Sequence, residues 1–128
     1  MYRKAYVLVL SLCLLFGVFG GTAMADPSGA EAEAIEHLID YIGQSHQIFI
    51  RNGEEHDAEA AAAHVREKYT RYKPQIRTAE DFIERAASKS LITGKPYLVK
   101  MSDGTQIEIN SWLTSELKKY REGEVRKN

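Results

Sequence analysis

Cysteine is nearly absent from this chain of 128 residues, in which Cys13 is the only one. It lies in an N-terminal apolar segment that we expect to be removed. The remaining chain would then have no disulfide, no thiolate metal site and no cysteine nucleophile. Lipidation at Cys13 is disfavoured, because the bulky Leu12 precedes it and the segment continues beyond it.

Long apolar runs are also lacking after the first 25 residues. Arg3 and Lys4 precede an apolar run over residues 5–19, and small residues follow at positions 23–25. This layout is typical of a secretory signal peptide cleaved after Ala25, which would place the protein in the periplasm or outside the cell. The run is shorter than the roughly 20 residues that a spanning helix needs, so no permanent membrane anchor is predicted.

An excess of basic residues is missing as well. Without Arg3 and Lys4 the chain carries 15 basic and 18 acidic residues, a net charge near −3. Nucleic-acid binding is disfavoured, because it requires a basic face. Removing 25 residues leaves 103, which is enough for one compact domain. The sequence gives no indication of the oligomeric state.

Residues 26–29 form a turn-rich start that we expect to be a flexible leader. Apolar residues with helical spacing then predict a first helix over residues 30–44. Residues 47–51 include β-branched and aromatic side chains, which favour a short strand. Asn52 and Gly53 supply a turn after it. Asp57 is placed to cap a second, alanine-rich helix that ends near Pro74 and packs closely on a neighbour.

The second half of the chain predicts a further helix, a hairpin and a last helix. Thr78 and Asp81 resemble a capping box for a third helix that ends around residues 88–90. Residues 97–101 and 105–109 flank a Ser-Asp-Gly turn, which indicates a β-hairpin. Asn110 or Ser111 is expected to cap the last helix.

We therefore predict a single α+β domain over residues 30–122, with the order α-β-α-α-β-β-α and a disordered tail over residues 123–128. Its sheet would have three mostly antiparallel strands packed on helices.

Several stretches of this chain resemble one known family. They are Phe49-Ile50-Arg51-Asn52-Gly53, the alanine-rich run ending in His64, Thr78-Ala79-Glu80-Asp81-Phe82-Ile83, Ala87-Ser88-Lys89-Ser90, Gly94-Lys95-Pro96-Tyr97-Leu98 and Trp112-Leu113. The chain resembles the YfeK-like family of small exported bacterial proteins of unknown function. The resemblance covers nearly all of residues 26–128 but implies no activity.

A metal site is disfavoured by the spacing of the histidines. His56 and His64 lie two helical turns apart if they share a helix, too far to bind one ion directly. Glu33 and His37 could form half a site, but no partner pair is evident. No motif in the sequence indicates a bound cofactor.

Two readings remain for the polar residues of the chain's middle third. His64 with Ser88 or Ser90 could act as a weak hydrolase, although serines at a helix end also satisfy free carbonyl groups. Arg51 and Asn52 could grip a carboxylate or a peptide terminus, although Arg51 could equally hold the turn through nearby acidic residues.

We favour a binding or interaction module for a peptide, an envelope component or a partner protein. Its candidate ligand-binding residues are Arg51, Asn52, His56, His64, Ser88, Ser90, Lys95 and Tyr97. A weak hydrolase and a purely structural envelope protein are the alternatives.

Overall fold

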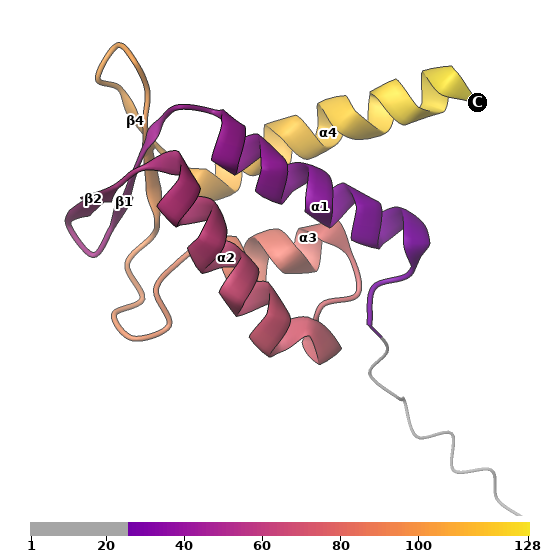
Figure 1. The fold of residues 1–128 in the computed structure, drawn as a ribbon, viewed down its shortest axis with the longest axis horizontal. Coiled ribbons are helices and arrows are strands. Elements are labelled where there is room, and N and C mark those ends of the chain that lie inside the picture. Colours follow the sequence, from indigo (N-terminus) through magenta and orange to yellow (C-terminus); the bar gives the residue numbers. More distant parts are fainter. Residues whose placement is uncertain (1–25) are drawn as a thin grey trace, which may run out of the picture.

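A computed structural model of the protein describes residues 26–128. The expected signal peptide lies outside these residues. In the described part of the chain four helices pack beside a small antiparallel sheet, so the predicted α+β class is confirmed (Figure 1). The observed order is α-β-β-α-α-β-β-α, with two short helical segments, η1 (Lys73–Gln75) and η2 (Ile83–Ala87), beside the main helices.

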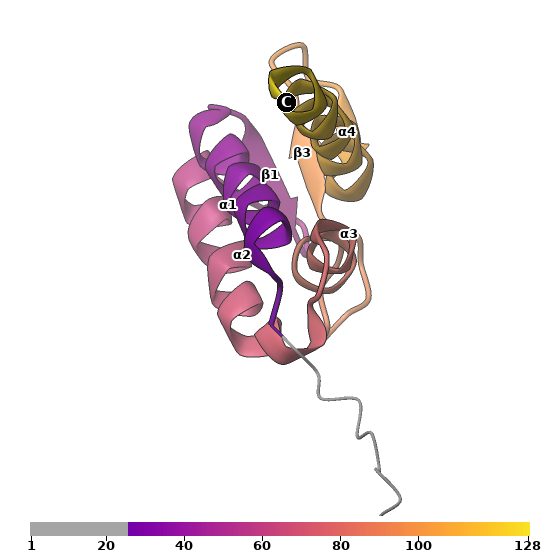
Figure 2. The same ribbon diagram turned by 90° about the vertical axis from the view of Figure 1, so that its right-hand side faces the viewer.

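The first helix, α1 (Gly29–Gln44), buries the apolar residues that predicted it, which include Ile35, Leu38, Ile39 and Ile42. Helix α2 (Ala58–Tyr72) begins as predicted, because the carboxylate of Asp57 accepts a hydrogen bond of 2.7 Å from the Ala60 amide. The two helices run side by side in both views (Figures 1 and 2). Their approach is close at Gly43, where an added Cβ would lie 3.4 Å from the Ala62 Cβ.

The prediction of three strands is wrong, because the sheet within residues 26–128 has four strands in the order β2-β1-β3-β4. Strand β1 (Ile48–Arg51) turns at Asn52 and Gly53, both with positive φ, directly into β2 (Glu54–His56). A two-residue turn with positive φ at both positions matches the right-handed twist of the two strands that it joins. Strand β2 has no apolar residue, which suits an edge strand but removes the signal by which strands are predicted.

The predicted capping box of the third helix is confirmed. The Thr78 hydroxyl accepts from the Asp81 amide, and the Asp81 carboxylate accepts from the Thr78 amide. Helix α3 (Ala79–Phe82) then widens into the π-helical η2. The Ser88 hydroxyl at its end donates to the Ile83 carbonyl oxygen over 2.6 Å, so it satisfies a carbonyl left free at the helix end.

The predicted hairpin is confirmed as β3 (Leu98–Lys100) and β4 (Gln106–Glu108). The last helix, α4, runs from Ile109 to Lys127 and therefore begins before the expected caps. Asn110 is inside it and donates to the Ser88 hydroxyl over 2.7 Å. The helix also continues past residue 122, so the expected disordered tail over residues 123–128 is helical up to Lys127.

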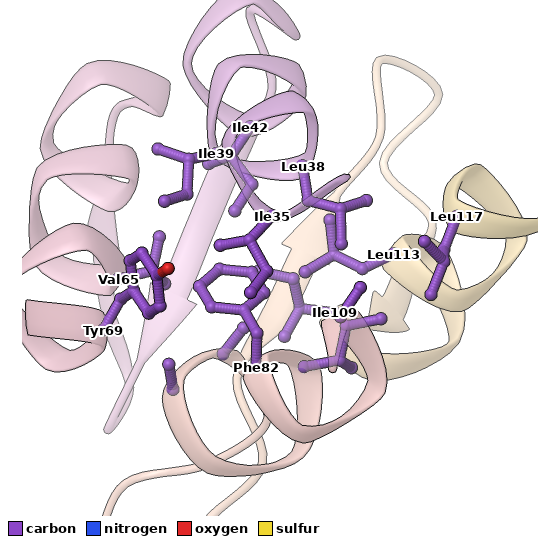
Figure 3. Packing of buried hydrophobic residues seen from close by; sticks show 14 of the residues in the cluster. Ile35, Leu38, Ile39, Ile42, Val65, Tyr69, Phe82, Ile109, Leu113 and Leu117 are labelled. Carbon is purple, nitrogen blue, oxygen red and sulfur yellow. The ribbon is translucent and has the colours of Figure 1, made fainter. Parts of the chain in front are cut away.

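Side chains from all four helices meet in one core, with the ring of Phe82 pointing into its centre (Figure 3). At the edge of this core, Arg121 of α4 forms salt bridges with Glu31 of α1 and Glu80 of α3. The Glu31 carboxylate also accepts a hydrogen bond of 2.7 Å from the Ala79 amide at the start of α3. One charged cluster thus joins the first helix, the third and the last.

Candidate functional site

A polar groove of about 620 Å³ lies between α2 and the loop over residues 88–97, and it is closed at one end by the β1–β2 turn. Its lining combines basic, aromatic and exposed aliphatic side chains with one acidic residue. They are Arg51, Asn52, Glu54, His64, Lys68, Arg71, Tyr72, Ser90, Leu91, Ile92 and Tyr97.

Lys68 is the most unusual residue of this groove, because only 6% of its surface is exposed. Its ammonium group donates to the Lys89 carbonyl oxygen over 3.0 Å and to the Tyr97 hydroxyl over 3.3 Å. The ammonium also lies 4.9 Å from the centre of the Tyr97 ring, within range of a cation–π interaction. The groups that directly contact the ammonium are therefore neutral.

The groove is lined by more positive than negative side chains, with Arg51, Lys68 and Arg71 against Glu54. Burial, and then the charge of Arg51, lower the pKa of Lys68 to about 8. Within residues 26–128 neither Lys68 nor Arg51 forms a salt bridge, whereas Arg71 pairs with Glu67. A buried cation without an acidic partner is unfavourable, and an anion in the groove would relieve that cost.

His64 lies one helical turn before Lys68 and contacts the same tyrosine. Its Nε2 is 3.2 Å from the Tyr97 hydroxyl, and the two rings meet edge to face. Burial lowers the pKa of His64, and the positive charges of Arg51 and Lys68 lower it further. Burial also raises the pKa of Tyr97. Near neutral pH His64 is therefore mostly uncharged and Tyr97 keeps its proton.

Asn52 fastens the 88–97 loop to the strand hairpin. Its amide donates to the Ser90 hydroxyl over 3.3 Å, and its side-chain oxygen accepts from the Thr93 hydroxyl over 2.6 Å. The Ser90 oxygen also accepts from the backbone amides of Ile92 and Thr93. Asn52 and Ser90 therefore set the position of the groove's far wall.

A second, much smaller cavity of about 30 Å³ adjoins the groove. Arg51, His64 and Tyr97 line both spaces. The other residues around the small cavity are Phe49, Ile50, His56, Ala60, Ala61, Val65 and Ile109. Within the described part of the chain, the buried Nε2 of His56 has no hydrogen-bond partner. An unpaired buried polar atom of this kind costs about 1–3 kcal/mol.

The structure gathers most of the residues selected from the sequence but separates two of them. Arg51, Asn52, His64, Ser90 and Tyr97 line the groove, and His56 lines the small cavity. Ser88 and Lys95 line neither. Ser88 is buried behind the loop. Lys95 is exposed, and it contributes to the loop through its backbone: its carbonyl oxygen accepts from the Ser90 amide, and its amide donates to the Thr93 hydroxyl.

The serine–histidine pair that a hydrolase would need is not assembled. Among the described residues His64 forms its side-chain hydrogen bond with Tyr97, not with Ser88 or Ser90. The Ser88 hydroxyl is occupied by Ile83 and Asn110, and the Ser90 oxygen accepts three N–H groups. Both serines therefore have architectural contacts.

Lys68 and Arg71 are site residues that sequence reasoning missed. The signal for Lys68 was present, because it follows Val65 by three positions and so continues the apolar stripe of α2. A lysine on an apolar stripe is a candidate for burial. Arg71 gave no such signal, because it is an exposed helix residue that reaches the groove from its rim.

Two other kinds of site were sought in residues 26–128. No group of three or more histidine, aspartate or glutamate side chains is arranged there to hold a metal ion. Neither is any described helix both long and apolar enough to cross a membrane.

These features define a small α+β domain with a cationic groove beside its second helix. Residues 29–121 match the model of a family of unknown function, DUF5329, and the chain belongs to this family. The chain is also similar to the uncharacterized protein YfeK of Salmonella typhimurium, with 40% identity over 76 residues. The match covers 59% of this chain and 63% of that relative. No solved structure matches.

Proposed function

We propose that the protein is an exported binding module that holds a carboxylate group of a peptide, an envelope component or a partner protein. The observation that carries this proposal is the buried ammonium of Lys68 near the guanidinium of Arg51, neither of which forms a salt bridge within residues 26–128. Both groups line the same groove. Two cations without acidic partners favour an anionic ligand.

The chemistry of the groove favours a carboxylate over a cation or a neutral sugar. A guanidinium group binds the two oxygens of a carboxylate in parallel, and an ammonium group adds a third charge-assisted hydrogen bond. The Tyr97 hydroxyl can donate as well, because it keeps its proton. Glu54 at the rim would repel a ligand with several negative charges, which favours a single carboxylate.

Export is part of the proposal and depends on the N-terminal segment. The basic residues, apolar run and Ala-Met-Ala site over residues 1–25 support secretion to the periplasm or beyond. Detection of the chain in an osmotic-shock fraction, with Asp26 as the first residue by N-terminal sequencing, would support cleavage after Ala25. Retention of the intact chain in the cytoplasm would overturn it.

The test of binding is an NMR titration of the isotope-labelled protein. Acetate and N-acetylglycine are the anionic probes, and methylammonium chloride controls for ionic strength. We expect amide shifts to saturate with the two carboxylates and to concentrate on the groove. The variants Arg51→Gln and Lys68→Met should abolish saturation, whereas Lys118→Met on the exposed face of α4 should not.

Two results would contradict the proposal. One is a set of shifts as large with methylammonium as with acetate. The other is saturable carboxylate binding that survives in both groove variants, since the ligand would then bind elsewhere. An absence of any saturable shift would favour a purely structural role.

A further inference from the structure

We propose that the small cavity beside the groove is a subsite for one methyl group, and that the ligand is a peptide with a C-terminal alanine. This inference rests on the proposed carboxylate binding and specifies its ligand. It is carried by three observations: the size of the cavity, its position next to the cations, and an unpaired histidine nitrogen in its lining.

The size of the cavity limits what can enter. A space of about 30 Å³ exceeds the roughly 10–15 Å³ that a cavity needs to hold one water molecule, but it is far below the ~150 Å³ of a cavity that binds benzene. It therefore admits a small group such as a methyl. Much of its lining is apolar, with Phe49, Val65 and Ile109 among the contributors. Apolar walls favour a methyl group over a water molecule, which needs several polar partners. A phenylalanine side chain would not fit without displacing these walls, because its ring is as large as benzene.

The position of the cavity links it to the carboxylate site. Arg51, His64 and Tyr97 line both the cavity and the groove, so a ligand atom in one space lies next to the other. In a C-terminal alanine, the methyl and the carboxylate are bonded to the same carbon atom. Such a residue can therefore place its carboxylate on Arg51 and Lys68 while its methyl group enters the cavity.

His56 offers a third point of contact. Its Nε2 is buried, lies in a residue that lines the cavity, and has no partner among the described residues. In the tautomer with the proton on Nδ1, this nitrogen accepts a hydrogen bond, and the alanine carbon carries an N–H group. Three different contacts around one carbon distinguish its two mirror-image forms. We therefore expect a clear preference for one enantiomer of alanine.

Ala60 provides a variant that closes the cavity without disturbing the core. It lines the cavity but is exposed on α2, so a leucine at this position is tolerated by the helix and adds bulk next to the opening. Ala63 is exposed on the same helix and lines neither space. Ala63→Leu is therefore the matched control for Ala60→Leu, and circular dichroism checks that both variants fold.

The experiment measures the affinities of fluorescein-labelled tripeptides by polarisation, with acetate titration by NMR as the reference. The peptides differ only at the last residue, which is L-alanine, D-alanine, glycine or phenylalanine with a free carboxylate, or alanine amide. We expect one alanine enantiomer to bind about fourfold more tightly than glycine, as burial of one methyl group predicts. Phenylalanine and the amide should bind at least about tenfold more weakly than that enantiomer.

The variants separate this inference from the function on which it rests. Ala60→Leu should remove the advantage of alanine over glycine, while Ala63→Leu should keep that advantage. Equal affinity for glycine and both alanine enantiomers, together with no effect of Ala60→Leu, would overturn the methyl subsite and leave carboxylate binding intact. Failure of every free carboxylate, acetate included, would overturn both.

Discussion

The ammonium group of Lys68 is a hydrogen-bond donor to the hydroxyl of Tyr97 and lies within cation–π distance of the same ring. The two residues come from α2 and from the loop before β3, so this contact holds the two walls of the groove together. His64 reaches the same hydroxyl from one turn earlier. The Tyr97 hydroxyl therefore contacts both His64 and Lys68 and links the 88–97 loop to α2.

Stability should rise with pH where Lys68 loses its proton. The ordinary pKa of 10.5 is lowered to about 8 in the folded protein, mainly by burial. Between these values the unfolded chain holds the proton and the folded protein releases it, so the free energy of unfolding increases with pH over this interval. Below pH 8 both states are charged and the full cost of burial remains.

Urea denaturation at pH 7.5 and pH 10 tests this relationship. We expect wild type to gain about 2 kcal/mol relative to Lys68→Met over this range, at roughly 1.4 kcal/mol per pH unit of pKa shift. At pH 7.5 Lys68→Met should be at least as stable as wild type, because an apolar side chain replaces a buried charge. A large loss of stability in Lys68→Met at pH 7.5 would show that the ammonium is net stabilising.

His64 should make the protein more sensitive to mild acid. Because burial and neighbouring cations lower its pKa from 6.5, the unfolded chain takes up a proton first as the pH falls. The free energy of unfolding therefore decreases below pH 6.5 until the folded protein is protonated too. Thermal melts between pH 7 and pH 5 should show a smaller decrease for His64→Gln than for wild type. Parallel curves for the two proteins would contradict the role of His64.

Replacing Asn52 with glycine should preserve the turn but weaken the attachment of the loop that lines the groove. Its φ of 51° lies in the left-handed region, which glycine adopts without strain. Asn52→Gly loses the side-chain bonds to Ser90 and Thr93, so stability should fall by about 1 kcal/mol and the loop amides should exchange faster. Asn52→Ala should cost about 1 kcal/mol more because of its Cβ.

Hydrogen exchange of the Ile92 and Thr93 amides measures the loop directly. Unchanged protection of both amides in Asn52→Gly would mean that the backbone contacts to Ser90 alone hold the loop. A matching loss of carboxylate affinity in the same variant would show that the position of the loop controls the groove.

The two glycines inside long helices should respond oppositely to leucine. An added Cβ at Gly43 would lie 3.4 Å from Ala62, whereas nothing lies within 4 Å of one at Gly123. Gly43→Leu should therefore push α1 and α2 apart and lower the free energy of unfolding by about 1–3 kcal/mol. Gly123→Leu should raise it by up to about 1 kcal/mol, because leucine favours the helix more than glycine. Equal melting temperatures for the two variants would contradict the close helix contact.

The helices could be predicted because their start signals act over a few residues. Asp57, and Thr78 with Asp81, form the caps that their types and spacing indicate. Strand β2 could not be predicted, because Glu54, Glu55 and His56 owe their conformation to pairing with β1 and not to any preference of their own. The start of α4 was placed too late because the side chain of Asn110 binds Ser88, a partner distant in the sequence.

The candidate site was predictable where turn chemistry and unusual residues coincide, as at Arg51 and Asn52. Its centre was not, because the burial of Lys68 depends on the 88–97 loop folding back over α2. Spacing along the helix places Lys68 on the apolar face. Only the tertiary structure supplies the Lys89 carbonyl and the Tyr97 hydroxyl, which accept hydrogen bonds from its ammonium group. Ser88 and Lys95 are close in sequence to the site residues, but in the structure they line neither the groove nor the small cavity.

The charged cluster of Glu31, Glu80 and Arg121 has a consequence for the order in which the chain can fold. Arg121 of α4 meets a residue of α1, so the contact forms only after every residue between these two helices has been made. The core residues of α4 that pack against α1 are also made after those of the other described helices. A chain still emerging from the ribosome therefore cannot close its core.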